Sequence, residues 1–298
     1  MPHLYEKAVL VKLTSHRPTL LYRDPAKTEQ LQQVTGDTAT AAYVRLFKSR
    51  TPVTQVISLH GEVGRLHQRL TLPYEDRHAR LLANVNYLTY SQRMRSAMDA
   101  VAEWFDQHRA KYPAYVAADC AERFQGNRDK EQERLKEYPS VETFEAALSH
   151  DLEFMPMPQL THFLFDLTDE DRQAFEARQV SVVERAVTDA LDRVRKPLDH
   201  LLARLSTYAK GPGQKFHTTL LTNVTDGISD MDQLLLQDVP PALRSQLDTL
   251  AATLTHLATD MDLLRDNAQI RTVLAGQVTQ TIDSVLLANK EITHAATA

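Results

Sequence analysis

Two histidines are the first residues whose type and spacing could bind a metal ion. His60 and His67 lie seven residues apart in a stretch with a helical pattern, so they share one face of the expected helix. Helical pairs of metal ligands lie three or four residues apart, because both side chains must reach one ion. No cysteine or carboxylate accompanies them at ligand spacing. We therefore expect no metal ion here, and two polar residues that flank an apolar stripe.

The other candidate groups also have simple structural interpretations. Asp199 and His200 are adjacent, and consecutive helical residues point apart, so a hydrolase dyad is not expected; the pair His150-Asp151 is equally weak. The acids at 169–171 could hold a divalent cation, but a helix N-terminus favours the same acids through its dipole. Cys120 is expected to pack as a small apolar residue. The sequence therefore predicts no catalytic residue, no cofactor and no metal ion, and a protein that is not an enzyme.

The composition disfavours nucleotide and nucleic-acid binding. The net charge is -5, so no global basic field attracts nucleic acid, although a local basic patch made by the fold stays possible. Only 8 glycines occur in 298 residues, and neither GxxxxGK[ST] nor GxGxxG is present. The cluster KGPGQK at 210–215 lies between two helical patterns and is expected to end a helix.

The start of the chain and the cysteine count indicate a cellular compartment. The opening residues MPHLYEKAVLVKL lack the basic region and long apolar run of a secretion signal. No stretch approaches the roughly 20 apolar residues that span a bilayer. A single cysteine suits a reducing environment. We expect a soluble protein of the cytoplasm with no membrane partner.

Strand patterns are confined to the first half of the chain and to one later segment. KAVLVKLTS alternates apolar residues with their neighbours, and SHRP can turn the chain so that TLLYR returns as a partner strand. A second strand pair is expected around 81–88. DLEFMPMPQLTHFLFDL is expected to be extended, and its prolines favour an edge strand or loop.

Helices are expected along most of the remaining chain. The helix at 24–36 has an aspartate N-cap, a proline in its first turn and a glycine stop. A helical stripe covers 54–70, and Pro113 should kink or break a long helix over 91–123. Helical patterns resume after residue 213. The last of them places Ile270, Val273 or Leu274, Val278, Ile282 and Leu286 on one stripe.

The longest helical pattern runs from Asp169 to Tyr208, with Thr168 as its N-cap, and would span roughly 60 Å. Pro197 should bend it near 192–193. Its apolar residues recur at steps of three or four, and we call them the seam: Val180, Val183, Val187, Leu191, Val194, Leu198, Leu201 and Leu205. The seam could be the partner-binding surface, or it could pack against the later helices as core. We favour core, with overhanging helix ends available to a partner.

These patterns predict a mainly α fold with a small β component, in which long antiparallel, coiled-coil-like helices accompany a short N-terminal antiparallel sheet. Three parts are expected: mixed strands and helices over 1–126, a charged linker and extended segment over 127–168, and a long helical hairpin or bundle over 169–298. The last part carries the acidic excess, with 5 basic and 10 acidic residues from Pro212 onward.

Several stretches together resemble a helical domain-of-unknown-function family of bacteriophages and mobile elements. They include KAVLVKLTSHRPTLLYRD, HQRLTLPYEDRHARLL and YPSVETFEAALSHDLEFMPMPQ, and the likeness covers most of the chain. Members of that family are typically encoded beside AAA ATPases of the MoxR and cobalt-chelatase type. The resemblance implies an adaptor or assembly partner of such an ATPase, and it brings no catalytic residue with it.

The leading expectation is therefore a non-enzymatic accessory protein that binds a MoxR-like AAA ATPase, itself, or both. One alternative is a self-assembling structural protein, such as a phage particle component, in which the seam would close between identical chains. Another is a nucleic-acid-associated protein of a recombination or defence locus, whose binding would weaken steeply with salt.

Overall fold

The computed structural model describes residues 7–47, 51–74, 78–124, 127–159, 168–208, 216–234 and 239–297. Contacts divide the chain into two compact units. Unit 1 comprises Met1–Lys12, Gln68–Leu88 and Glu153–Ala298, and unit 2 comprises Leu13–His67 and Thr89–Leu152. Both units are thus discontinuous in sequence, whereas the three expected parts followed the order of the chain. The expected fold class, mainly α with a small β component, is confirmed.

A four-stranded sheet has the order β4-β5-β1-β6. Its strands are β1 (Ala8–Ser15), β4 (Leu72–Pro73), β5 (Ala79–Ala83) and β6 (His150–Met155). β5 pairs antiparallel with β1, from Ala8 opposite Ala83 to Lys12 opposite Ala79, and also with β4. β6 lies at an edge, as expected for a strand followed by prolines.

The expected hairpin between the first strand and TLLYR is wrong. Leu21–Arg23 does form a strand, β2, but it pairs antiparallel with β3 (Tyr43–Arg45) in a separate two-stranded sheet. The first strand instead has β5 and β6 as its neighbours. Alternation of apolar residues identifies a strand from local sequence, but the partner depends on contacts between segments that are distant in the chain.

Unit 2 is built mainly from helices whose ends agree with the local sequence signals. α2 (Pro25–Thr35) begins after Asp24, whose side chain accepts from the Lys27 amide, and ends at Gly36 with φ of 69°. The helix expected over 91–123 is broken near Pro113, into α4 (Tyr87–His108) and α5 (Tyr112–Phe124) with a 3₁₀ turn between them. The other helices are α3 (Pro52–Leu70), α6 (Arg128–Leu135) and α7 (Val141–Ala146).

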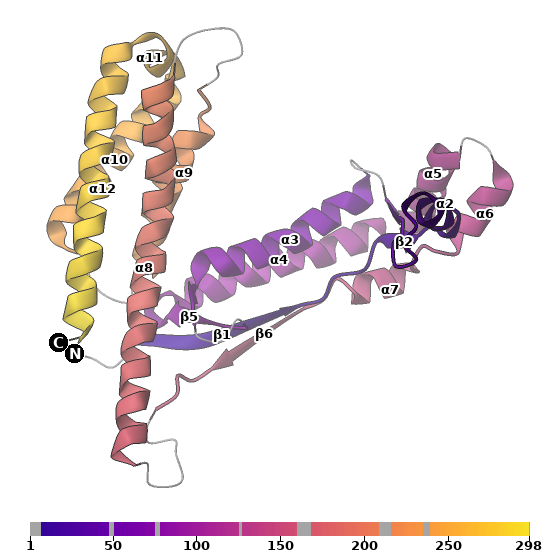
Figure 1. Ribbon diagram of the computed structural model, residues 1–298, viewed down its shortest axis with the longest axis horizontal. Coiled ribbons are helices and arrows are strands. Elements are labelled where there is room, and N and C mark those ends of the chain that lie inside the picture. The colour runs from indigo at the N-terminus through magenta and orange to yellow at the C-terminus, as the bar shows by residue number, and fades with distance from the viewer. Residues whose placement is uncertain are drawn as a thin grey trace. The chain divides into compact units, whose positions relative to one another are not determined.

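Unit 1 contains a four-helix bundle, seen at the left of Figure 1. Its long helices are α8 (Asp169–Thr207), α9 (Thr219–Leu234), α10 (Pro241–Thr259) and α12 (Ala268–Thr297), with the short α11 (Met261–Asp266) before the last. Each long helix packs against two others: α8 and α10 each contact both α9 and α12. α8 and α12 run antiparallel, and Thr188 of α8 donates to Asn289 of α12 at 3.2 Å.

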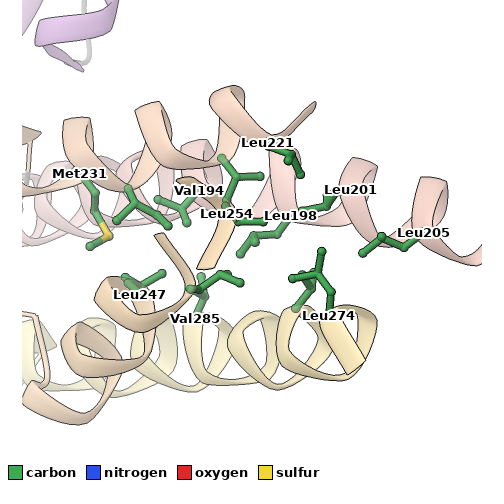
Figure 2. Close-up of a cluster of buried hydrophobic side chains, with 14 of the residues drawn as sticks. Val194, Leu198, Leu201, Leu205, Leu221, Met231, Leu247, Leu254, Leu274 and Val285 are labelled. Atoms are coloured by element: carbon green, nitrogen blue, oxygen red, sulfur yellow. The ribbon is translucent and has the colours of Figure 1, made fainter. Parts of the chain in front are cut away.

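The core of the bundle consists of leucine, valine and methionine side chains from all four long helices. Figure 2 shows Val194 and Leu198 of α8, Met231 of α9, Leu247 of α10 and Val285 of α12 pointing into the shared interior. Burial of such side chains supplies the main favourable term of folding. The helical patterns in the second half of the chain thus belong to one internal core.

The apolar stripe expected on the last helix is only partly correct. Leu274 and Val278 are buried, but Val273 and Leu286 are exposed. The buried stripe continues instead through Val285, Ala288 and Ile292. α12 packs against both α8 and α10, and the two contacts together select a face that apolar spacing alone did not identify.

Two expected features fall wholly or partly outside the described residues. The cluster KGPGQK at 210–215 lies there, and so does the part of the extended segment over 160–167. Among the helices that the structure describes, none is long and apolar enough to cross a membrane.

Candidate interaction surface

The seam of α8 lies mostly inside the chain's own core. Six of its eight side chains are buried among the bundle residues: Val187, Leu191, Val194, Leu198, Leu201 and Leu205. Val183 is partly buried against the same core, and Val180 is half-buried. A partner therefore cannot contact these six side chains in this conformation. For them the favoured alternative, a seam that packs within the chain's own core, agrees with the structure.

A second face of α8, formed by residues that are not part of the seam, packs against the sheet of unit 1. Val182, Ala186 and Ala190 are buried in a cluster with Leu81 of β5 and Leu10 of β1. The three helical residues lie four apart, so they form one row along α8. Alanine lets a helix approach a sheet closely because its side chain is a single methyl group. Between Val182 and Ala190 α8 is thus covered on two sides.

The first turns of α8 are the part of this helix that remains on the surface. Between Asp169 and Arg178 only Phe175 is even partly buried. Thr168 caps the helix, since its hydroxyl accepts from the Asp171 amide at 3.1 Å and donates to the Asp171 carboxylate at 2.6 Å. Figure 1 shows this end of α8 extending past the end of α12. The ten residues from Asp169 to Arg178, nine of them exposed, correspond to about 15 Å of helix, which matches the expected overhang.

Unit 1 also exposes four large apolar side chains from two segments of the chain, which we call the exposed cluster. It consists of Val85, Tyr87, Leu88 and Phe154. Val85 is 87% exposed and Leu88 is 72% exposed, so most of each side chain is in contact with solvent. The rings of Tyr87 and Phe154 pack edge to face, with centroids 5.0 Å apart. This contact places the start of α4 against β6.

The chain reaches the exposed cluster directly from the buried sheet. β5 ends at Ala83, whose side chain packs in the same cluster as α8. A 3₁₀ turn over Asn84–Asn86 follows, and α4 begins at Tyr87. This short turn carries Val85 out of the sheet layer, so its side chain has no core to enter. A rigid strand and a helix start therefore hold the cluster in place from both sides.

The histidines considered as metal ligands are buried side chains with separate partners. His67 Nδ1 lies 2.7 Å from the Tyr90 hydroxyl, whereas His60 Nε2 lies 3.2 Å from Ser15 Oγ. The ring of His60 also lies against that of His150, with centroids 4.2 Å apart and the planes tilted by 36°. They do not merely flank an apolar stripe, as expected, but belong to the interior. The described residues contain no group of three or more potential metal ligands.

The remaining candidate groups also have structural roles. The Asp199 carboxylate lies 3.4 Å from Arg195 on the same helix, and Asp171 takes part in the Thr168 cap. Cys120 is buried, and burial raises the pKa of its thiol, which keeps it protonated and unreactive. Burial also lowers the pKa of His60, and it lowers the pKa of His150 to about 4.

Comparisons with protein-family models, with curated proteins and with solved structures found no match to this chain. The exposed cluster, the overhang of α8 and the family resemblance of the sequence are therefore the features that bear on function.

Proposed function

We propose that this chain is a non-enzymatic accessory protein that binds a MoxR-like AAA ATPase through the exposed cluster of Val85, Tyr87, Leu88 and Phe154. The exposed cluster is the observation that carries the proposal. The resemblance to a family encoded beside such ATPases supplies the identity of the partner. The overhang of α8 is a second part of the contact.

The composition of the cluster suits a protein interface. Aromatic residues are enriched at interface centres, and apolar side chains there gain free energy when a partner excludes water from them. Burying Val85 and Leu88 completely would contribute about 1.5 to 3 kcal/mol each before the costs of association. The exposed polar residues Asn84 and Glu153 flank the cluster in sequence, as expected for an interface with a polar rim.

The overhang of α8 offers a complementary polar contact. Asp169, Glu170 and Asp171 are exposed in its first turn, so this end of the helix presents three carboxylates to solvent. Acidic side chains accelerate association with a basic surface and help to select the partner, while contributing less to affinity than the apolar centre does. The proposed partner therefore carries basic residues as well as an apolar patch.

Self-assembly through the seam is the weaker alternative. A seam that closed between identical chains would need the side chains from Val187 to Leu205 on the surface, and these pack within the bundle of a single chain. Assembly by that route would require the bundle to open.

The test is co-elution of the purified chain with a MoxR-like ATPase from the same locus, followed by size-exclusion chromatography with light scattering. We expect a complex with wild type and a changed ATPase rate. The double variant Val85→Ser/Leu88→Ser should lose the complex, whereas the control Val273→Ser/Leu287→Ser, on exposed residues of α12, should keep it. Separate elution of both wild-type proteins, or a large homo-oligomer of this chain alone, contradicts the proposal.

A further inference from the structure

Unit 2 contains a pocket of about 590 Å³, and no residue of the exposed cluster lines it. Its walls come from the start of α2, from the paired strands β2 and β3, and from α5 and α6. Pockets that bind small molecules commonly measure about 300 to 1,000 Å³, so this one can hold a ligand larger than water or a simple ion.

Basic side chains dominate the charged lining of the pocket. The acidic lining residues are Asp24 and Glu133, and the basic ones are Lys27, Arg45, Arg123, Lys130 and Arg134. Part of this charge is used within the protein. Arg123 is held by Asp119 at 2.7 Å and donates to the Leu46 carbonyl at 2.8 Å. Lys27 lies 3.9 Å from Asp24, whose carboxylate also caps α2.

Arg45 and Lys130 are the basic side chains of the lining that remain available. Both are exposed, and neither forms an ion pair with a residue in the described part of the chain. They come from different elements, Arg45 from β3 and Lys130 from α6. A ligand between them would therefore be bound from two walls of the pocket.

Arg134 is a third basic side chain of the lining, and its guanidinium is already paired with Asp24 through one of its nitrogens. Its guanidinium carbon lies 3.9 Å from the centre of the Tyr22 ring, which fixes the plane of the group. Nη2 makes a long contact of 3.5 Å with Asp24. Nη1 is buried and has no hydrogen-bond partner. An unsatisfied buried N–H is costly, so an acceptor that reached Nη1 would gain a charge-assisted hydrogen bond.

We propose that this pocket binds a small phosphomonoester, whose phosphoryl group is held by Arg45, Lys130 and Arg134. A phosphate dianion matches the excess of basic side chains better than a single carboxylate does. The planar guanidinium forks of two arginines suit phosphate oxygens. The Phe124 ring, also in the lining, offers an apolar wall to the organic part of the ligand. The site goes beyond the proposed function and does not depend on it.

The test is isothermal titration calorimetry of the full chain at constant ionic strength, with phenyl phosphate, inorganic phosphate and benzoate as probes. We expect saturable binding of phenyl phosphate, with inorganic phosphate weaker and benzoate weaker still. Equal affinity for inorganic phosphate would overturn the claim that the ligand is an ester. Equal affinity for benzoate would overturn the claim that the pocket selects phosphate.

Variants locate the binding within the pocket. Arg45→Gln and Lys130→Gln should each weaken phenyl phosphate about fivefold or more, since each removes one charged contact. Both residues are exposed, so these variants should fold. Arg93→Gln makes the same charge change on the exposed surface of α4 and should leave the affinity unchanged. Equal weakening by Arg93→Gln, or no saturable binding of any probe to wild type, would overturn the proposal.

Discussion

Gly227 of α9 lies directly against the backbone of Arg193 in α8. A Cβ atom at position 227 would come within 2.9 Å of the Arg193 carbonyl oxygen, closer than real Cβ contacts allow. The neighbour is backbone, so it cannot move aside as a flexible side chain could. The absence of a side chain at Gly227 therefore lets α8 and α9 approach each other at this point.

Gly227→Ala should consequently destabilise the protein, although alanine favours helix more than glycine does. We expect a loss of about 1 to 3 kcal/mol, because the helices must separate or shift to admit the methyl group. Chemical denaturation measures it. Gly276→Ala is the matched control: Gly276 lies within α12, and an added Cβ there meets nothing within 4 Å. The control should be neutral or stabilise by up to about 1 kcal/mol. Equal effects would show that α8 and α9 do not make this close contact.

Asp119 holds together the interior of unit 2. Its carboxylate is buried, accepts from Arg123 Nε at 2.7 Å, and accepts a short hydrogen bond from the Tyr138 hydroxyl. Asp119→Asn removes the negative charge and leaves the Arg123 guanidinium uncompensated. We expect a loss of about 3 kcal/mol in the free energy of unfolding. Asp99→Asn, on the exposed surface of α4, should change stability by less than about 0.5 kcal/mol. A similar small effect at both positions would contradict this role.

His150 should make stability depend on pH. In the unfolded chain its pKa is near the ordinary value of about 6.5, whereas in the fold burial lowers the pKa of His150 to about 4. Between these values the unfolded state binds more protons, so stability falls as pH is lowered through this window. The loss should be about 2 kcal/mol, since part of the ring is still reached by solvent. Burial lowers the pKa of His60 as well, which adds in the same direction.

Urea denaturation at pH 7, 6, 5 and 4.5 measures this dependence. His150→Phe keeps an aromatic ring beside His60 and should flatten the profile between pH 6.5 and 4. His200→Gln alters an exposed histidine of α8 and should leave the profile of wild type unchanged. A profile that His150→Phe does not flatten would mean that His150 is protonated in the fold as readily as in the unfolded chain.

The position of each seam residue along α8 predicts how much stability its substitution by alanine removes. Leu198 is fully buried in the bundle, so Leu198→Ala should cost about 2 to 5 kcal/mol. Val180 is only half-buried near the exposed end, so Val180→Ala should cost less than about 1 kcal/mol. Thermal unfolding followed by circular dichroism compares the two. A mild effect of Leu198→Ala would indicate that the seam faces outward in solution.

Local chemistry accounts for the parts of the fold that the sequence predicted well. Asp24 and Gly36 bound α2 because one satisfies free amides at the helix start and the other adopts a left-handed conformation at its end. Thr168 starts α8 by the same kind of side-chain cap. Pro113 lies at the start of α5, where a missing amide proton costs nothing. Each of these residues acts only on the backbone within a few positions of itself, so its effect can be predicted from local sequence.

Contacts between distant segments account for the errors. The pairing of β2 with β3 rather than with β1 is not encoded in the alternation of either strand. The row of Val182, Ala186 and Ala190 on α8 was missed because alanine is neutral in an apolar pattern, and the row is buried only because the sheet lies against it. Helix ends are thus predictable from this sequence, whereas the choice of buried face is not.

One residue of the exposed cluster, Leu88, could have been identified from the sequence as a possible interface residue. Leu88 lies four residues before Gln92 and seven before Arg95, so all three share one face of α4. Gln92 and Arg95 are both exposed. A leucine on an otherwise polar helical face indicates either a tertiary contact or an interface. Only the structure shows that Tyr87, beside Leu88 in the chain, packs against Phe154 of β6.

The affinity between this chain and a MoxR-like ATPase of the same locus, measured by equilibrium titration with matched variants, tests the proposed function most directly. The account predicts that Val85→Ser/Leu88→Ser weakens binding at least about tenfold, as loss of central apolar contacts does. Val273→Ser/Leu287→Ser, which removes exposed apolar side chains elsewhere in unit 1, should keep the affinity of wild type. Equal affinities for all three proteins would contradict the claim that the exposed cluster is the binding surface, and no measurable binding of wild type would contradict the choice of partner.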